Sequence, residues 1–350
     1  MSLLKRALEK PLYPFELDGK FYKPTRSEIW KEFFYRVNPL KTKKNWLPFC
    51  SWVVTCSLVI PFILFFLLFF KLKVLIFGLI YSMVVLGSHG TLYLHRYSTH
   101  RAFKFGNQVV LFIIRNLVIK IIPEEIYIIS HHVHHHFSDK PGDPYNVNGG
   151  WLYCFLADAN HQPISRSLDQ KDYLTLTKLM NHTGVHLNTY EQYSKWGSLC
   201  HPLFTCTHFV LNWFVWYSIF FLIGGHSLAC GIFGLSGIWA FGVRTFNYDG
   251  HGRGKDKRKD GVDFDRNDLS INQLWPGFVA GEWHNNHHLY PRGARSGFLS
   301  YQIDLPWYFI WLLWRLRGIE TYHDYKNEFL EKYYLPYKTA VESECRHAHS

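Results

Sequence analysis

Apolar residues along the chain gather in four long stretches with almost no charge. The first, residues 47–70, reads LPFCSWVVTCSLVIPFILFFLLFF and contains no charged residue. A helix of this length can cross a hydrocarbon layer of about 30 Å. Two lysines then lead into residues 74–94, and a second pair, residues 203–223 and 227–246, is joined by three residues. The pattern predicts an all-α integral membrane protein with four transmembrane helices in two hairpins.

Polar segments flank the two predicted hairpins. Residues 95–202 and 247–302 are rich in charged residues and histidines, so we expect them to form a helical cap outside the lipid. The apolar stretch 303–317 is interrupted by acidic and basic residues and is predicted to lie in the membrane interface. The expected organisation is an N-terminal segment, one main domain and a C-terminal tail, at residues 1–46, 47–318 and 319–350.

Basic residues give the orientation of this arrangement. The formal net charge is +11, and 36 of the 38 Lys and Arg residues fall on one side of the predicted hairpins. The positive-inside tendency makes that side cytoplasmic, with both termini and the cap. Basic residues gathered beside the membrane surface account for the net charge of the chain, so no nucleic-acid partner is needed to explain it. The seven cysteines are scattered and never form CxxC, which argues against a disulfide scaffold or a thiolate zinc site.

Histidines cluster at four places in the predicted cap. HRYSTH begins at His95, SHHVHHHFS spans residues 130–138, NYDGH ends at His251, and HNNHH begins at His284. On a helix, residues at i, i+3 and i+4 share a face, so HxxHH directs three imidazoles at one point. In the second cluster, two registers satisfy this spacing: His131, His134 and His135, or His132, His135 and His136.

An even number of predicted crossings separates the four clusters, so all of them face one compartment and can meet. Two copies of HxxHH, the pair in HRYSTH and His251 make nine imidazoles, about twice what one metal ion holds, which points to two ions. Imidazole ligands suit iron, zinc, copper or nickel. Each imidazole also needs a partner for its second nitrogen, and Asp143, Asp249 and Glu282 are the nearest carboxylates.

The chain resembles the membrane-bound fatty-acid desaturases, in particular the Δ9 group that acts on acyl-CoA or acyl-lipid. The resemblance covers about residues 47–318. It rests on His95-Arg-Tyr-Ser-Thr-His100, the HxxHH of the 130s followed by Phe137-Ser138 and Asp143-Pro144-Tyr145-Asn146, Asn247 with His251, and Gly281-Glu282-Trp283-His284-Asn-Asn-His287-His288. The basic residues that acyl-CoA-specific members carry around the second box are absent here, so the head group of the substrate stays open.

The resemblance implies an O2-dependent di-iron enzyme that introduces a cis double bond into a long-chain acyl group. It favours the register that starts at His131, so His132 and His136 are expected next to the ligands or on the solvent side of the helix. It also places Leu79 and Met83 at the closed end of an acyl tunnel. Asn247 would reach one metal through a water molecule. The implied ligands are His95, His100, His131, His134, His135, His251, His284, His287 and His288.

The two electrons that the reaction consumes need a source outside this sequence. No fused cytochrome b5 motif, ferredoxin cysteine set or dinucleotide fingerprint is present, so we expect a separate donor such as cytochrome b5 or ferredoxin. A hydroxylase or ketolase with the same di-iron site is an alternative. A histidine-rich metal transporter or sensor is another, but its histidines should line the membrane helices, where only His89 lies deep.

Overall fold

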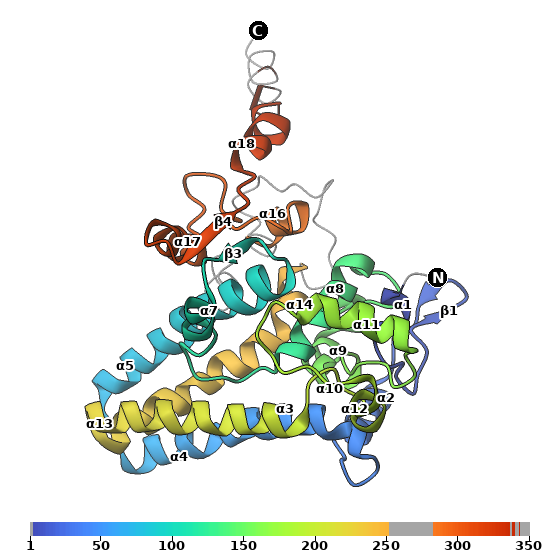
Figure 1. The fold of residues 1–350 in the computed structure, drawn as a ribbon, viewed down its shortest axis with the longest axis horizontal. Helices are drawn as coiled ribbons and strands as arrows, with labels where there is room; N and C mark the ends of the chain where they lie inside the picture. The colour runs from blue at the N-terminus through green and yellow to red at the C-terminus, as the bar shows by residue number, and fades with distance from the viewer. Residues whose placement is uncertain (1–2, 252–282, 337, 340–342, 344–350) are drawn as a thin grey trace.

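The long apolar helices lie together, and the shorter helices gather at one end of them (Figure 1). This computed structural model describes residues 3–251, 283–336, 338, 339 and 343. Within this part of the chain, three helical segments are long and apolar enough to cross a membrane: Lys43–Leu68, Leu72–Thr99 and Pro202–Gly250. The protein is mostly helical, as the hydrophobic pattern predicted.

The first two spans are each divided into several pieces. Pro61 explains the break at Leu58, because its ring lacks an N–H donor and crowds the carbonyl group one turn earlier. The second span changes from α to π geometry twice; its last π segment contains His95, and His100 is the C-cap of that segment. The first span comprises η1 (Lys43–Asn45), α3 (Trp46–Ser57) and α4 (Val59–Leu68), and the second comprises α5 (Leu72–Ile80), η2 (Tyr81–Leu86), α6 (Gly87–His89) and η3 (Gly90–Thr99).

The third span, which starts with α13 (Pro202–Gly242), folds back on itself. Gly224 and Gly225 leave the helical conformation, and Gly225 has φ of 65°. The rings of Trp213 and Phe233 then lie 5.3 Å apart, whereas twenty residues of straight helix would separate them by about 30 Å. The three candidate spans therefore contain four apolar helical segments. The span ends with η5 (Val243–Thr245) and α14 (Phe246–Gly250).

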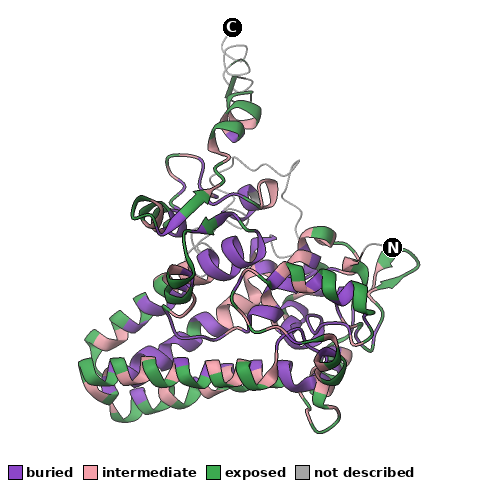
Figure 2. Cartoon of the chain, in the orientation of Figure 1, coloured by how far each residue is buried: buried purple, intermediate pink, exposed green. Residues whose placement is uncertain are grey.

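Glycines allow the apolar helices to approach one another closely. A Cβ atom on Gly234 would lie 2.4 Å from the Cα of Phe62, and one on Gly231 would lie 2.3 Å from a methyl group of Val74. Small residues serve this purpose between membrane helices. The outward faces are exposed but apolar (Figure 2), with Leu222 82% exposed. A surface of this kind is suited to lipid rather than water.

The shorter helices pack around α8 (Glu124–Phe137), which carries the second histidine cluster. Pro123 precedes it and two glutamates occupy its first turn, both of which favour a helix start. Its apolar side joins a buried cluster with residues from the N-terminus and from α11. The surrounding elements are α1 (Leu4–Ala7), β1 (Glu16–Leu17), β2 (Lys20–Phe21), α2 (Arg26–Arg36), α7 (Gln108–Arg115), η4 (Val147–Gly149), α9 (Trp151–Phe155), α10 (Ala157–Asn160), α11 (Gln170–Met180) and α12 (Tyr190–Trp196).

Two small sheets depart from the all-helical expectation. β1 pairs with β2, and β3 (Phe103–Phe105) pairs with β4 (Ile319–Tyr322) in antiparallel fashion. Strands of two to four residues have too few alternating positions to be recognised from sequence. The second sheet ties the end of the first histidine box to the C-terminal part of the chain, which also contains α16 (His284–Leu289), α17 (Leu305–Arg315), α18 (Lys326–Phe329) and η7 (Leu330–Tyr334).

A buried ion pair joins the first and third histidine segments. The fully buried guanidinium of Arg96, next to His95, donates to Asp304 at 3.1 Å and to the hydroxyl of Ser296 at 2.8 Å. The carbonyl of Ser296 in turn accepts from the amide of Asn286 at 2.7 Å, inside the third box. Arg96 therefore fixes the position of the helix that carries His284 and His287.

We expect Arg96→Met to lower the thermal unfolding midpoint of the detergent-solubilised protein. The change leaves Asp304 buried without its cationic partner, and breaking a buried ion pair costs about 3–5 kcal/mol. Lys104→Met is the matched control, because the Lys104–Glu320 pair is 69% and 51% exposed and such pairs add little to stability. Equal midpoints for the two variants would contradict the structural role of Arg96.

Candidate metal centre

Local backbone geometry brings the first two histidines together. His95 and His100 are five residues apart, a spacing that does not share a face of an α-helix. In η3 the backbone is a π-helix, and the N–H of His100 donates to the carbonyl of His95 at 3.1 Å, the i→i+5 bond that defines this geometry. The two ring centroids lie 5.0 Å apart. π segments inside α-helices are often found at functional sites.

The helices α8 and α16 each supply three imidazoles, and each divides them between two groups. On α8, His131 and His135 lie one turn apart and enter the first group, whereas His134 enters the second. On α16 the division is reversed, with His287 in the first group and the one-turn pair His284 and His288 in the second. The two HxxHH motifs therefore face each other and share both groups.

The first group contains five imidazoles: His95, His100, His131, His135 and His287. Four of their Nε2 atoms form a closed quadrilateral whose edges measure 2.8, 3.1, 2.9 and 3.0 Å. A square with edges of this length has its centre roughly 2.1 Å from each corner, which is the length of a metal–imidazole bond. The arrangement therefore fits one bound metal ion.

The second group contains His134, His251, His284 and His288. The Nε2 atoms of His284 and His288 are 3.1 Å apart, and the His134 and His251 ring centroids are separated by 5.0 Å. The Nε2 atom of His134 is buried and has no hydrogen-bond partner among the described residues. A buried ring nitrogen without a partner, facing three other imidazoles, fits a second metal ion.

Two carboxylates orient the second group from behind. Asp143 accepts a hydrogen bond from Nδ1 of His134 at 2.9 Å and from the backbone N–H groups of Asp139 and Tyr145. Asp139 accepts from Nδ1 of His251 at 2.8 Å. A carboxylate on the second nitrogen sets the tautomer and direction of a ligand imidazole. A neutral imidazole that donates from Nδ1 carries its lone pair on Nε2, and the Nε2 of His134 faces the other imidazoles of the second group.

Burial keeps the imidazoles in the neutral form that binds metals. Desolvation, strengthened by the neighbouring imidazoles, holds their pKa values well below the ordinary value of histidine. A protonated ring has no lone pair to offer, so this environment favours coordination near neutral pH. The groups for which this holds are His100, His131, His135, His284, His287 and His288.

The structure brings together all nine histidines expected as ligands, and it leaves His132 and His136 outside both groups. His132 is half-buried, and desolvation lowers its pKa to about 4. His136 is exposed and packs against Phe137. Of the carboxylates proposed as orienting partners, Asp143 contacts His134, Asp249 lies half-buried in α14, and Glu282 lies outside the described residues.

Asp139 is a functional residue that the sequence reasoning missed. It follows the second box directly and has φ of 59°, a left-handed conformation in which Asp is more often found than most residues. Its partner His251 is 112 residues away, so no local pattern indicates the contact. The only sequence signal was a carboxylate adjacent to a histidine cluster, which is too common to be used alone.

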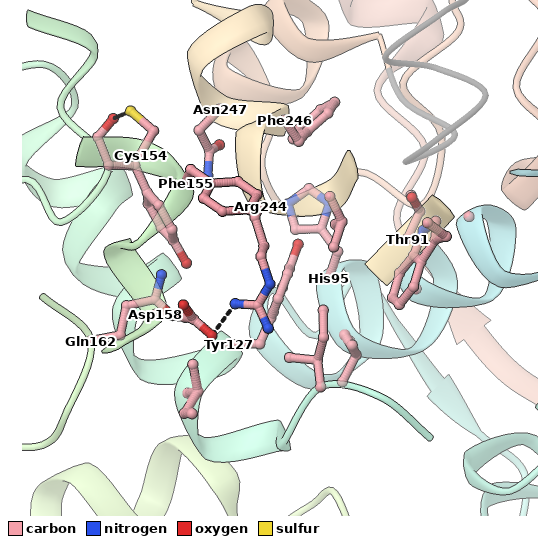
Figure 3. A pocket seen from close by; sticks show the side chains of 18 residues that line it. Thr91, His95, Tyr127, Cys154, Phe155, Asp158, Gln162, Arg244, Phe246 and Asn247 are labelled. Carbon is pink, nitrogen blue, oxygen red and sulfur yellow. Dashed lines mark hydrogen bonds and ion pairs between the residues drawn. The ribbon is translucent and has the colours of Figure 1, made fainter. Parts of the chain in front are cut away.

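A cavity runs along the metal-binding region between the apolar helices and the cap. Its wall includes His95 and Asn247, and Figure 3 shows both side chains among those that line it. The buried Oδ1 of Asn247 has no hydrogen-bond partner among the described residues. Seven of the other lining residues have large apolar side chains: Leu94, Ile122, Ile126, Phe155, Trp239, Val243 and Phe246.

The two residues expected at the tunnel end lie beyond the described cavity. On the second span the cavity reaches Gly87, one helical turn after Met83. Met83 packs against a buried apolar cluster that includes Trp239, and Leu79 is 37% exposed. A role for these two residues in setting chain length stays a prediction.

The chain is similar to several known proteins. The family model for fatty acid desaturase matches residues 72–337. Delta-9 desaturase-like 3 protein of Arabidopsis thaliana is 28% identical over 244 residues, which cover 65% of this chain and 69% of the relative. Hex-5-enoyl-(acyl-carrier protein) acetylenase of Moorena producens (strain JHB) is 28% identical over 329 residues, which cover 87% of this chain and 93% of the relative. The sn-1 stearoyl-lipid 9-desaturase of Anabaena variabilis is 28% identical over 236 residues, which cover 66% of this chain and 76% of the relative.

We expect Asp143→Asn to weaken metal binding by the second group about 10–100-fold, because the charge that orients His134 is lost. Metal content measured by plasma mass spectrometry during titration with a chelator should show one ion released earlier than in the unmodified protein. Asp169→Asn is the control, since Asp169 caps α11 by accepting from the N–H of Asp172. Identical release curves for the two variants would exclude the orienting role of Asp143.

Proposed function

The chain belongs to the fatty acid desaturase family and is an enzyme that desaturates fatty acyl groups; we propose that it does so with two iron ions and O2. The resemblance noted in the sequence is thereby confirmed at the level of the family. We further propose that the product is a cis double bond at the Δ9 position of a long-chain acyl group. Support for Δ9 comes from the names of relatives such as sn-1 stearoyl-lipid 9-desaturase.

The observation that carries the di-iron proposal is the division of nine imidazoles, all buried or half-buried, into two adjacent groups. We assign His95, His100, His131, His135 and His287 to one iron and His134, His251, His284 and His288 to the other, with Asn247 joined through water. Bound iron would supply the O2-dependent oxidation that no side chain can perform. Imidazole ligands suit iron as they suit zinc, copper and nickel, and the O2-dependent oxidation favours iron among these metals.

The protein's own residues position the acyl chain and keep water away. The apolar wall of the cavity holds an acyl chain beside His95, where its methylene groups can reach the metal site. Tyr127 and Tyr145 also line this space. The hydroxyl groups of Tyr145 and Ser130 share a hydrogen bond of 2.8 Å. A dry cavity limits side reactions of a strong oxidant.

We propose four membrane crossings in two hairpins, with the reversal at Gly224 and Gly225 as the second hairpin turn. The metal site, the cap and both termini then face the cytoplasm, the side that carries 36 of the 38 basic residues. The proposed organisation remains an N-terminal segment, a desaturase domain and a C-terminal tail at residues 1–46, 47–318 and 319–350. A separate electron donor, such as cytochrome b5 or ferredoxin, would dock on this basic face.

Expression of the chain in cells without a related desaturase tests the proposed activity. Gas chromatography with mass spectrometry of the membrane-lipid and acyl-CoA pools should show acyl chains lighter by two hydrogens, with the double bond at one position. The pool in which the new product appears first identifies the head group of the substrate. A mass gain of one oxygen would instead indicate a hydroxylase, and no new product in either pool would contradict the proposal.

We expect His287→Ala to abolish the double-bond product while the protein still accumulates in the membrane. The change removes one corner of the Nε2 quadrilateral in the first group. His136→Ala is the matched control, because His136 is exposed and outside both groups, and it should keep full activity. Desaturation by His287→Ala at the unmodified rate would refute the assigned site.

A further inference from the structure

A buried ion pair lies on the wall of the otherwise largely apolar cavity. Arg244 of η5 and Asp158 of α10 both line it, and their side chains are 6% and 12% exposed. Figure 3 shows Arg244 pointing toward Asp158, with the ion pair between them. Charged groups are costly to bury, so their presence beside an acyl-binding space calls for a specific reason.

The first membrane helix holds this pair in a fixed position. Thr55 accepts a hydrogen bond from Nη2 of Arg244 at 2.7 Å, and the indole of Trp52 lies 4.2 Å beneath the guanidinium. Asp158 accepts from the indole N–H of Trp52 at 3.1 Å and from the hydroxyl of Ser51 at 3.3 Å. Contacts on the Trp52 face and at both Nη atoms leave the guanidinium little freedom to move.

Two of the five N–H groups of this guanidinium, one on each Nη atom, donate to Asp158 and Thr55. Nε of Arg244 is buried and has no hydrogen-bond partner among the described residues. An unsatisfied buried donor of a charged group is strongly unfavourable, and native proteins rarely keep one. A ligand atom that accepts a hydrogen bond in the cavity would remove this penalty.

The chemistry of the donor identifies the ligand atom. A guanidinium only donates, and in a saturated acyl ester or thioester the carbonyl oxygen is the strong acceptor. Asp158 already balances the charge of Arg244, so the site favours a neutral carbonyl over a free carboxylate. We infer that Arg244 is a specificity-determining residue that binds the acyl carbonyl oxygen; this inference rests on the proposed desaturase function.

A fixed carbonyl determines which methylene groups reach the metal site. Arg244, Asn247 and His251 follow one another at intervals of three and four residues along η5 and α14, close to one helical turn each. The separation between the carbonyl anchor and the metal ligand is therefore set by the backbone. The enzyme then counts carbon atoms from the carbonyl end of the chain, for a thioester and for an oxygen ester alike.

Two variants test the anchor through the position of the double bond. Arg244→Lys keeps the charge opposite Asp158 but removes the Nε–H donor. The double change Arg244→Leu with Asp158→Leu removes both charges and leaves neither unpaired. In both variants we expect the share of positional isomers to rise about tenfold, as loss of one charge-assisted hydrogen bond predicts. Arg36→Lys is the control, since its buried pair with Glu32 does not line the cavity.

Double-bond positions are read by mass spectrometry of the derivatised products from the acyl-CoA and membrane-lipid pools. If the variants made less product but kept the double bond at the same position, Arg244 would have only a structural role, and the inference would be overturned.

A series of saturated fatty acids of increasing length, fed to cells with the unmodified enzyme, tests the same point without a variant. We expect the double bond to keep its distance from the carbonyl. A position that moves with chain length would overturn both the Δ9 assignment and the inference, whereas absence of any double bond in the unmodified enzyme would refute the proposed desaturase function. A constant position in the unmodified enzyme that is lost in the two Arg244 variants assigns the carbonyl anchor to Arg244 itself.

Discussion

The whole molecule depends on holding nine imidazoles together at two adjacent points. Burial lowers the pKa values of His100 and His287, and the neighbouring rings lower them further. A crowded set of neutral nitrogen atoms is stable only where their lone pairs have a partner, and two metal ions would meet this need. The histidines come from four segments, so the rest of the fold has to bring these segments into register.

Carboxylates near the histidines perform most of this alignment. Asp139 and Asp143 lie in one short turn after the second box, yet they orient His251 and His134, which come from different elements. The backbone N–H of Asp139 also donates to Asp143 at 2.7 Å, so the turn is fixed as a unit. Arg96 and Asp304 do the same for the third box through Ser296. Residues that touch no metal therefore determine where the ligands lie.

Sequence reasoning succeeded where the signal is local. The HxxHH spacing and the apolar stretches each depend on neighbours within a few residues, and the structure has helices at both kinds of position. It did not reveal the π-helix that brings His95 and His100 together, because π geometry has no reliable sequence pattern. Contacts across long separations were also hidden: Asp139 with His251 over 112 residues, and Arg244 with Asp158 over 86. Their residue types are common, and only the fold makes them neighbours.

Two helices that leave the apolar bundle explain why the site lies at its end. The second span passes from lipid-suited residues through Gly87 and Leu94 at the cavity to His95. The returning half of α13 passes from Trp239 to Arg244 and Asn247 and ends at the C-cap of α14 with His251. On both paths the order is apolar wall, cavity, then metal-binding histidine. In the proposed function, an acyl chain lying between the two helices would therefore pass from a hydrocarbon environment to the imidazole groups without exposing its methylene groups to water.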